Sequence, residues 1–224
     1  MKSMTKGFVI AAAVVCLGAA TSVRAGVVVF NDFGPGDSYG ASGYELGYDH
    51  NVGLTSEIAC GFTVAAGQNY TLSEIDFAAS IVSGTNAIGV ALLADSGGVP
   101  GTTLESWTVS GLGQYPALTP PEVVISTLHP TLLAGQQYWL ALTMGDSTTF
   151  AVWHNNSIGV TGPGYVISDG RGTLYEGDTG FVGAFRVEGT SSAVPEPSTL
   201  AGAGIAVFLG LGYAWRRRKA KHTA

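Results

Sequence analysis

The chain has 224 residues, 33 of them glycine, and a formal net charge of −6. Between Gly26 and Val194 two basic residues, Arg171 and Arg186, stand against fifteen Asp and Glu, so this body carries a net charge of −13. A body of this size fits one domain, and its charge argues against nucleic acid as a partner because phosphates are bound through basic patches. The surplus of carboxylates is compatible with cations, neutral polysaccharides and an aqueous exterior, and its simplest role is solubility.

The first 25 residues have the three parts of a secretory signal peptide. Lys2 and Lys6 precede an apolar segment, residues 7–20, and small residues at Val23 and Ala25 fit a signal peptidase site. We therefore expect signal peptidase to cleave after Ala25 and to leave Gly26 as the first residue. The alternative is an N-terminal membrane helix, but the apolar segment is shorter than the roughly 20 residues that a span needs.

Short apolar runs separated by turn residues fill the body, and helical periodicity is nearly absent. This pattern predicts an all-β domain over residues 26–188, an antiparallel β-sandwich of jelly-roll type with eight to ten strands. Residues 31–56 and 155–180 are rich in Gly, Asp and Asn and are interpreted largely as loops, and residues 189–193 as a linker. The expected strands cover residues 27–30, 57–64, 70–80, 87–94, 103–109, 122–128, 137–144, 148–154, 165–168 and 181–187.

Cys60 is the one cysteine of the body, because Cys16 lies within the signal peptide. No intrachain disulfide is therefore expected. Cys60 lies in an apolar run without basic neighbours, which predicts a small buried side chain rather than a reactive thiol.

Two patterns resemble catalytic or transition-metal motifs. Residues 36–40 match G-x-S-x-G around Ser38, but nothing helical is predicted to follow, as a nucleophile elbow requires. His50, His129 and His154 show no ligand spacing, so surface or loop positions are expected for them. The sequence thus predicts neither an enzyme nor a cofactor.

Calcium is a stronger possibility than a transition metal, because carboxylates recur in Gly-rich turns. The simpler interpretation is that these side chains cap their own turns. The candidates are Asp95, Asp146, Asp169, Glu176 and Asp178.

Three tryptophans, Trp107, Trp139 and Trp153, offer rings on which sugars stack. Trp139 lies in an apolar run and is expected in the core. Trp153, next to His154, Asn155 and Asn156, is the best candidate for an exposed aromatic side chain.

The last thirty residues carry the most specific pattern in the chain. A polar motif with Pro195, Glu196 and Pro197 precedes an apolar run of 16 residues, 200–215, and a basic cluster at residues 216–221. The run is just short of the usual lower limit of about 17 residues for a membrane helix, and the cations would keep the tail cytoplasmic. One alternative is a plain tail anchor, which would have the same apolar run and basic cluster. The polar motif before the run argues against it.

Residues 194–219 resemble the PEP-CTERM sorting signal of exported bacterial proteins in order, spacing and composition. The resemblance implies a membrane-anchored precursor that an exosortase processes near Pro195, Glu196 and Pro197. It also implies export through the inner membrane to the cell surface or extracellular matrix.

The body is similar to the choice-of-anchor domains, extracellular β-sandwiches joined to alternative anchors. The resemblance spans residues 55–187 and rests on residues 62–64, 94–104 and 133–140, which are turns and strands. It implies a fold and no catalytic residues. We therefore expect an exported surface or matrix protein with a structural or adhesive role, linked to exopolysaccharide; a carbohydrate-binding module is the alternative and a secreted hydrolase a third possibility.

Overall fold

The computed structural model describes residues 26–49, 54–168, 175–177, 180 and 182–191, and every regular element among them is a β-strand. The strands are β1 (Val27–Asn31), β2 (Tyr39–Asp49), β3 (Leu54–Thr63), β4 (Tyr70–Phe77), β5 (Ala79–Ser83), β6 (Ala87–Asp95), β7 (Pro100–Ser110), β8 (Gly113–Gln114), β9 (Glu122–Ile125), β10 (Thr131–Leu132), β11 (Gln137–Met144), β12 (Phe150–Asn156), β13 (Gly164–Ser168), β14 (Tyr175–Gly177) and β15 (Phe185–Ser191).

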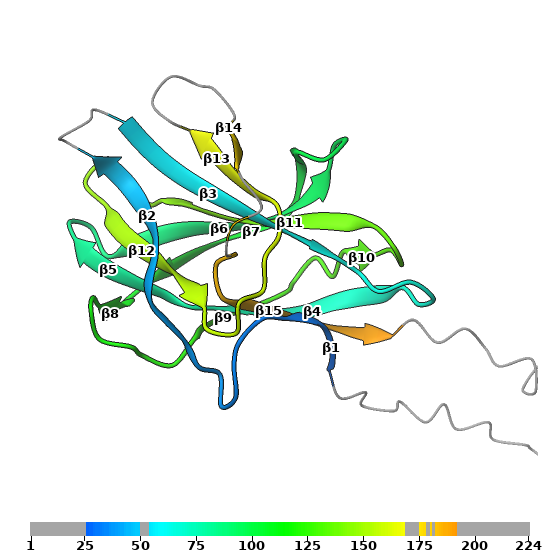
Figure 1. The fold of residues 1–224 in the computed structure, drawn as a ribbon. Helices are drawn as coiled ribbons and strands as arrows, with labels where there is room; N and C mark the ends of the chain where they lie inside the picture. The colour runs from blue at the N-terminus through cyan, green and yellow to red at the C-terminus, as the bar shows by residue number, and fades with distance from the viewer. Residues whose placement is uncertain (1–25, 50–53, 169–174, 178–179, 181, 192–224) are drawn as a thin grey trace, which may run out of the picture.

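These strands form two sheets that face each other as in a β-sandwich (Figure 1). The smaller sheet has the order β1-β15-β4-β10, with β9 also paired to β4. The larger has the order β7-β6-β11-β3-β2-β12-β5-β8, with β13 on β3 and β14 on β13. All pairs are antiparallel except the short β5–β8 pair, so the predicted all-β class is confirmed and the larger sheet is mixed.

One apolar core joins the two sheets. Ile75 of β4 and Val187 of β15 come from the smaller sheet, and Leu92 of β6 and Leu140 of β11 come from the larger; all four are fully buried in one cluster. Because successive strand residues point to opposite faces, this places Glu74, Asp76, Arg186 and Glu188 on the outer face of the smaller sheet.

The predicted run 70–80 is divided between the two sheets. β4 belongs to the smaller sheet and β5 to the larger, and the chain crosses from one to the other at Ala78, whose N–H bonds to the Ala184 carbonyl. The alternation of apolar residues continues through the crossing, so the sequence alone shows one strand where the fold has two.

The interpretation of residues 31–56 as a long loop was wrong, since β2 covers eleven of them and β3 begins at Leu54. Glycine marks close backbone approach in β2 as well as turns. A Cβ on Gly43 would lie 2.1 Å from the Trp153 carbonyl oxygen of β12. Within residues 155–180, β13 confirms the strand predicted at residues 165–168, and β14 is a strand that was not predicted.

The domain also extends beyond its predicted end at residue 188. β15 continues to Ser191, where it pairs with Tyr70, so residues 189–191 of the predicted linker lie in a strand. The small residues Gly189, Thr190 and Ser191 suggested a spacer, but backbone pairing with β4 fixes them.

Glu105 of β7 is a buried charge that holds the chain after β9. Its carboxylate accepts hydrogen bonds from the Ser126 hydroxyl at 2.6 Å and from the backbone N–H groups of Thr127 and Leu128 at 2.6 and 3.0 Å. Burial acts to raise the pKa of Glu105, but these hydrogen bonds outweigh it and the pKa is lowered.

We expect Glu105→Gln to lower the free energy of unfolding by about 1–3 kcal/mol at pH 7, because an amide cannot accept all of these bonds and leaves buried donors unpaired. The lowered pKa gives the pH dependence its sign: the stabilisation is present above the unfolded pKa of Glu and is lost as pH falls through the folded pKa. Urea unfolding at pH 7 and pH 3 measures both effects. A difference between the two proteins that does not shrink in acid would contradict this account of Glu105.

Candidate functional site

The predicted processing residues fall mostly outside the described part of the chain. Ala25, Pro195, Glu196 and Pro197 lie outside it, as do the apolar run 200–215 and the basic tail 216–221. Gly26, the predicted new N-terminus, is described and exposed. The described residues contain no helix of the length and apolar character that a bilayer crossing requires.

Ser38 lies in a tight turn and not in a nucleophile elbow. Gly36 and Asp37 both have positive φ, and Gly34 and Ser38 form a β-bridge across the turn. The chain then enters strand β2, and the Ser38 hydroxyl lies 3.4 Å from the Ser157 hydroxyl. The G-x-S-x-G match therefore reflects turn chemistry.

Of the histidines that the structure describes, His154 differs from the prediction in its burial. It was expected at the surface or in a loop, but it is fully buried in β12, with Tyr39 and Tyr115 packed against its ring. Its Nε2 lies 2.8 Å from the Ser80 hydroxyl and its Nδ1 3.0 Å from the Gly40 carbonyl oxygen. Burial lowers the pKa of His154, so the neutral imidazole is favoured.

The serine–histidine pair has hydrogen-bond geometry that a nucleophile also uses, but Ser80 and His154 both have no exposed surface. A hydrolytic pair must reach substrate and water, so this pair serves the interior. His129 agrees with expectation: it is exposed in the turn before β10 with φ of 50°. His50 lies outside the described residues.

The expectation that Trp153 is exposed was wrong. Its ring is fully buried, and its indole N–H lies 3.3 Å from the Ala184 carbonyl oxygen. Trp139 is buried as predicted and donates to the Asp95 carboxylate at 2.8 Å. Trp107 is half-buried, with its N–H on the Ile125 carbonyl oxygen.

Two calcium candidates, Asp95 at the end of β6 and Asp146 in the loop after β11, already accept hydrogen bonds from protein donors. Asp95 accepts from the Gly98 N–H and from the side chains of Gln137 and Trp139. Asp146 accepts from the N–H groups of Thr148 and Thr149 and from the Thr148 hydroxyl. The side chains of Thr85 and Thr148 and the backbone N–H groups of Thr148 and Thr149 together lower the pKa of Asp146 to about 2. Both cap their turns, as the simpler interpretation held. Asp169, Asp178 and the side chain of Glu176 lie outside the described residues.

Cys60 is buried, as predicted, and it lies near the buried carboxyl group of Asp32, which was not among the predicted site residues. Burial raises the pKa of the Cys60 thiol to about 12, and its sulfur accepts the Gly183 N–H at 3.3 Å. Asp32 is also fully buried: Oδ1 accepts the Phe185 N–H at 2.6 Å, and Oδ2 has no hydrogen-bond partner. Burial raises the pKa of Asp32 to about 7.

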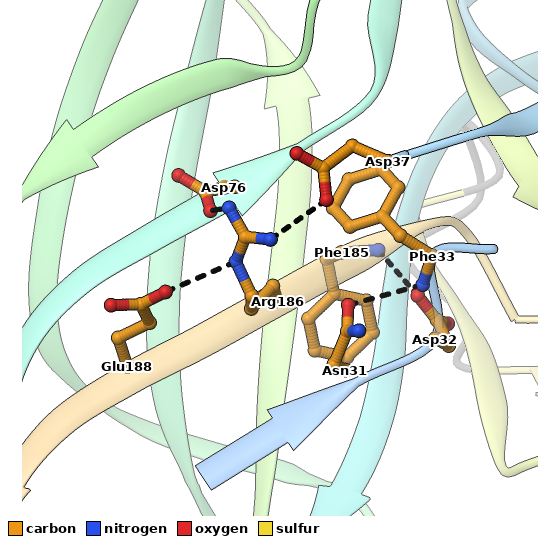
Figure 2. Close-up of polar contacts among 8 residues, drawn as sticks. All are labelled: Asn31, Asp32, Phe33, Asp37, Asp76, Phe185, Arg186 and Glu188. Carbon is orange, nitrogen blue, oxygen red and sulfur yellow. Dashed lines mark hydrogen bonds and ion pairs between the residues drawn. The ribbon is translucent and has the colours of Figure 1, made fainter. Parts of the chain in front are cut away.

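The densest group of charges in the described structure surrounds Arg186 on the outer face of the smaller sheet (Figure 2). Arg186 forms ion pairs with Asp37 at 2.8 Å, with Glu188 at 3.2 Å and with Asp76. Its guanidinium also lies 6.0 Å from the centre of the Phe33 ring. The Arg186 guanidinium thus ties β4 and β15 to the turn that holds Asp37.

Glu74 completes the group from β4. The strand register places Glu74 opposite Glu188 and Asp76 opposite Arg186. Burial raises the pKa of Glu74, and the neighbouring charges of Asp76 and Glu188 raise it further. Four carboxylates therefore share one guanidinium, which leaves a local surplus of negative charge.

Sequence reasoning missed this group, although a weak signal was present. Glu74 and Asp76 are two residues apart in one predicted strand, and Arg186 and Glu188 are the same distance apart near the end of another. That spacing puts each pair on one face of its strand. The pairing of β4 with β15, more than a hundred residues apart in the sequence, brings the pairs together.

Comparison with known proteins identifies one segment of the chain. Residues 193–219 match the PEP-CTERM protein-sorting motif, so the resemblance seen at 194–219 is confirmed to within one residue. No curated protein matches the chain. The C-terminus thus carries a PEP-CTERM sorting motif, which supports export and sorting to the cell surface by an exosortase-type enzyme.

Proposed function

We propose that the chain is an exported structural or adhesive protein of the cell surface or extracellular matrix. Signal peptidase removes residues 1–25, the helix 200–215 holds the precursor in the inner membrane, and an exosortase-type enzyme processes it near residues 195–197. The match of residues 193–219 to the sorting motif carries this proposal. The last described strand ends at Ser191, two residues before the matched segment begins in the sequence.

An adhesive role gains support from β9, which pairs only with β4 among the described strands. Val123 and Ile125 are each more than half exposed on this strand, and Leu128 is 69% exposed just after it. Apolar side chains along a strand edge are a common contact surface for another protein. We propose no catalytic role, because the one Ser–His pair of the described residues is buried.

The test replaces Pro195, Glu196 and Pro197 with alanine in a chain tagged after Ala224. We expect export to continue while the precursor, still tagged, stays in the inner membrane, because proline holds the motif extended and outside the helix. Fractionation blots in a host with an exosortase report the result. Ser191→Ala with Ser192→Ala, just outside the motif, is the matched control and should behave as the parent does.

If the alanine variant reaches the surface and loses its tag as the parent does, residues 195–197 are not a processing signal. The signal for processing would then lie elsewhere in the chain.

Carbohydrate binding remains the second candidate, and one observation favours it. A surface hollow of about 280 Å³ is lined by Tyr115, Glu45 and Ser42, among others, and Tyr115 is 37% exposed. An exposed aromatic ring beside polar groups is what sugar stacking requires. A glycan array probed with the parent and with Tyr115→Ala tests it: glycan binding that the variant loses supports this function, and no binding by the parent removes it.

A further inference from the structure

We propose that Glu74, Asp76 and Glu188 form a binding site for a divalent cation of the calcium type, on the outer face of the smaller sheet. The three carboxylates each offer an oxygen within 4.8 Å of the other two. Oxygens that share one Ca²⁺ lie about 2.3–2.6 Å from the ion, and are therefore at most about 5 Å apart. The spacing thus suits a single ion between the three side chains.

The ion pairs of Arg186 leave suitable oxygens unused. Arg186 contacts Oδ2 of Asp76 and Oε1 of Glu188. Oδ1 of Asp76 is buried and has no hydrogen-bond partner, and the residue as a whole is only 1% exposed. A buried oxygen without a partner loses its hydration and gains nothing in return, which is costly for a carboxylate. An ion at the centre of the group would bind this oxygen directly.

The local charge also favours a cation. Asp37, Glu74, Asp76 and Glu188 place four carboxylates around one guanidinium, a surplus of three negative charges when all are ionised. A bound cation would offset part of this surplus.

The donor set selects the ion. The three residues offer carboxylate oxygens and neither imidazole nor thiolate, which favours Ca²⁺ over Zn²⁺ or Cu²⁺. Mg²⁺ demands near-ideal octahedral geometry and dehydrates reluctantly, whereas Ca²⁺ accepts a flexible shell of oxygen ligands, so three carboxylates from two paired strands favour Ca²⁺ over Mg²⁺. With three protein ligands and water completing the shell, we expect weak binding, with Kd of about 10⁻⁴–10⁻³ M, as in other extracellular modules.

The test measures thermal unfolding of the full chain in detergent at pH 8, with CaCl₂, MgCl₂ or EDTA. Millimolar CaCl₂ should raise Tm above both other conditions. Glu74→Gln and Glu188→Gln should each weaken the calcium response at least tenfold in concentration. Glu45→Gln, which removes the same charge from an exposed position on β2, should respond as the parent does.

Stability without calcium keeps the test interpretable. Glu74→Gln removes repulsion and should have an EDTA Tm at least equal to the parent's, so a lost calcium response cannot be attributed to misfolding. A calcium response of Glu74→Gln and Glu188→Gln equal to that of the parent overturns the proposal, as does an equal response to MgCl₂.

The N-terminal ammonium group of a chain that begins at Gly26 would compete with a metal ion for the three carboxylates. A Cβ on Gly26 would lie 2.7 Å from Oε2 of Glu188, so a chain that begins at Gly26 brings its α-ammonium group close to the three carboxylates. The chain that starts at Gly26 and the chain that retains residues 1–25 are therefore compared. A calcium response restricted to the longer chain would assign the carboxylates to the ammonium group and overturn the metal site in the mature protein.

Discussion

Asp32→Asn is expected to remove a fall in stability that the parent protein shows between about pH 4 and pH 7. The pKa of Asp32 is raised from 3.8 to about 7 in the folded protein, chiefly by burial. Between these values the folded state holds a proton that the unfolded state has released, so the free energy of unfolding decreases as pH rises. The loss is complete above pH 7, and about three pKa units correspond to on the order of 4 kcal/mol.

Asparagine suits this position because it imitates the protonated acid. Its carbonyl oxygen can still accept the Phe185 N–H, and it never carries charge into a site where Oδ2 has no partner. Urea unfolding at pH 4.5, 6 and 8 gives the comparison. We expect the variant to resemble the parent at pH 4.5 and to be the more stable protein at pH 8, by a few kcal/mol. Glu45→Gln, an exposed neutralisation, controls for net charge and should leave the slope unchanged.

An Asp32→Asn variant whose stability falls with pH as steeply as that of the parent would assign the slope to other groups. Glu57 and Glu122 are the alternatives to examine next, because burial raises the pKa of both.

Local sequence was sufficient to predict a segment where the composition and order of residues within that segment determine its structure or role. β11 begins and ends at the predicted residues, because an uninterrupted apolar run in the middle of a sheet is buried on both faces. The sorting motif was predictable for a similar reason: order, spacing and charge are all local, and the match at residues 193–219 confirms them.

Burial in β12 could not be predicted from the sequence of β12. Polar neighbours next to Trp153 suggested a surface, yet Trp153 and His154, which point to opposite faces, are both fully buried. The second face is covered by Tyr39 and Tyr115, which come from distant parts of the chain. The pattern within a strand indicates which residues share a face, but not what covers that face.

The charged group around Arg186 was missed for the same physical reason. Each of its strands has charges at alternate positions, which is ordinary for a solvated face. Only the register of β4 with β15 makes Glu74 and Glu188 neighbours, and only the turn at Asp37 closes over Arg186. Register between segments this far apart is set by the whole core and is not read from either strand.

Gly43→Ala is expected to destabilise the domain by about 3 kcal/mol or more, a large effect for one methyl group. The added Cβ would lie 2.1 Å from the Trp153 carbonyl oxygen and 2.7 Å from the His154 Cα, both on the backbone of β12. Trp153 and His154 are fully buried, so β12 cannot move away without disturbing the core. Overpacking of this kind usually costs about 1–3 kcal/mol, and a backbone contact leaves fewer ways to relax than a side-chain contact.

Gly164→Ala is the matched control, because it adds the same methyl group to a glycine within a strand. Its Cβ would meet nothing nearer than the Ala59 carbonyl oxygen at 4.0 Å, and Gly164 has no left-handed backbone. The control should therefore unfold within about 0.5 kcal/mol of the parent, since it creates no clash and no cavity. Urea unfolding of the full chain in detergent measures both variants. Equal stability of the two would mean that β2 and β12 do not approach each other closely at Gly43, and that the glycines of β2 have another role.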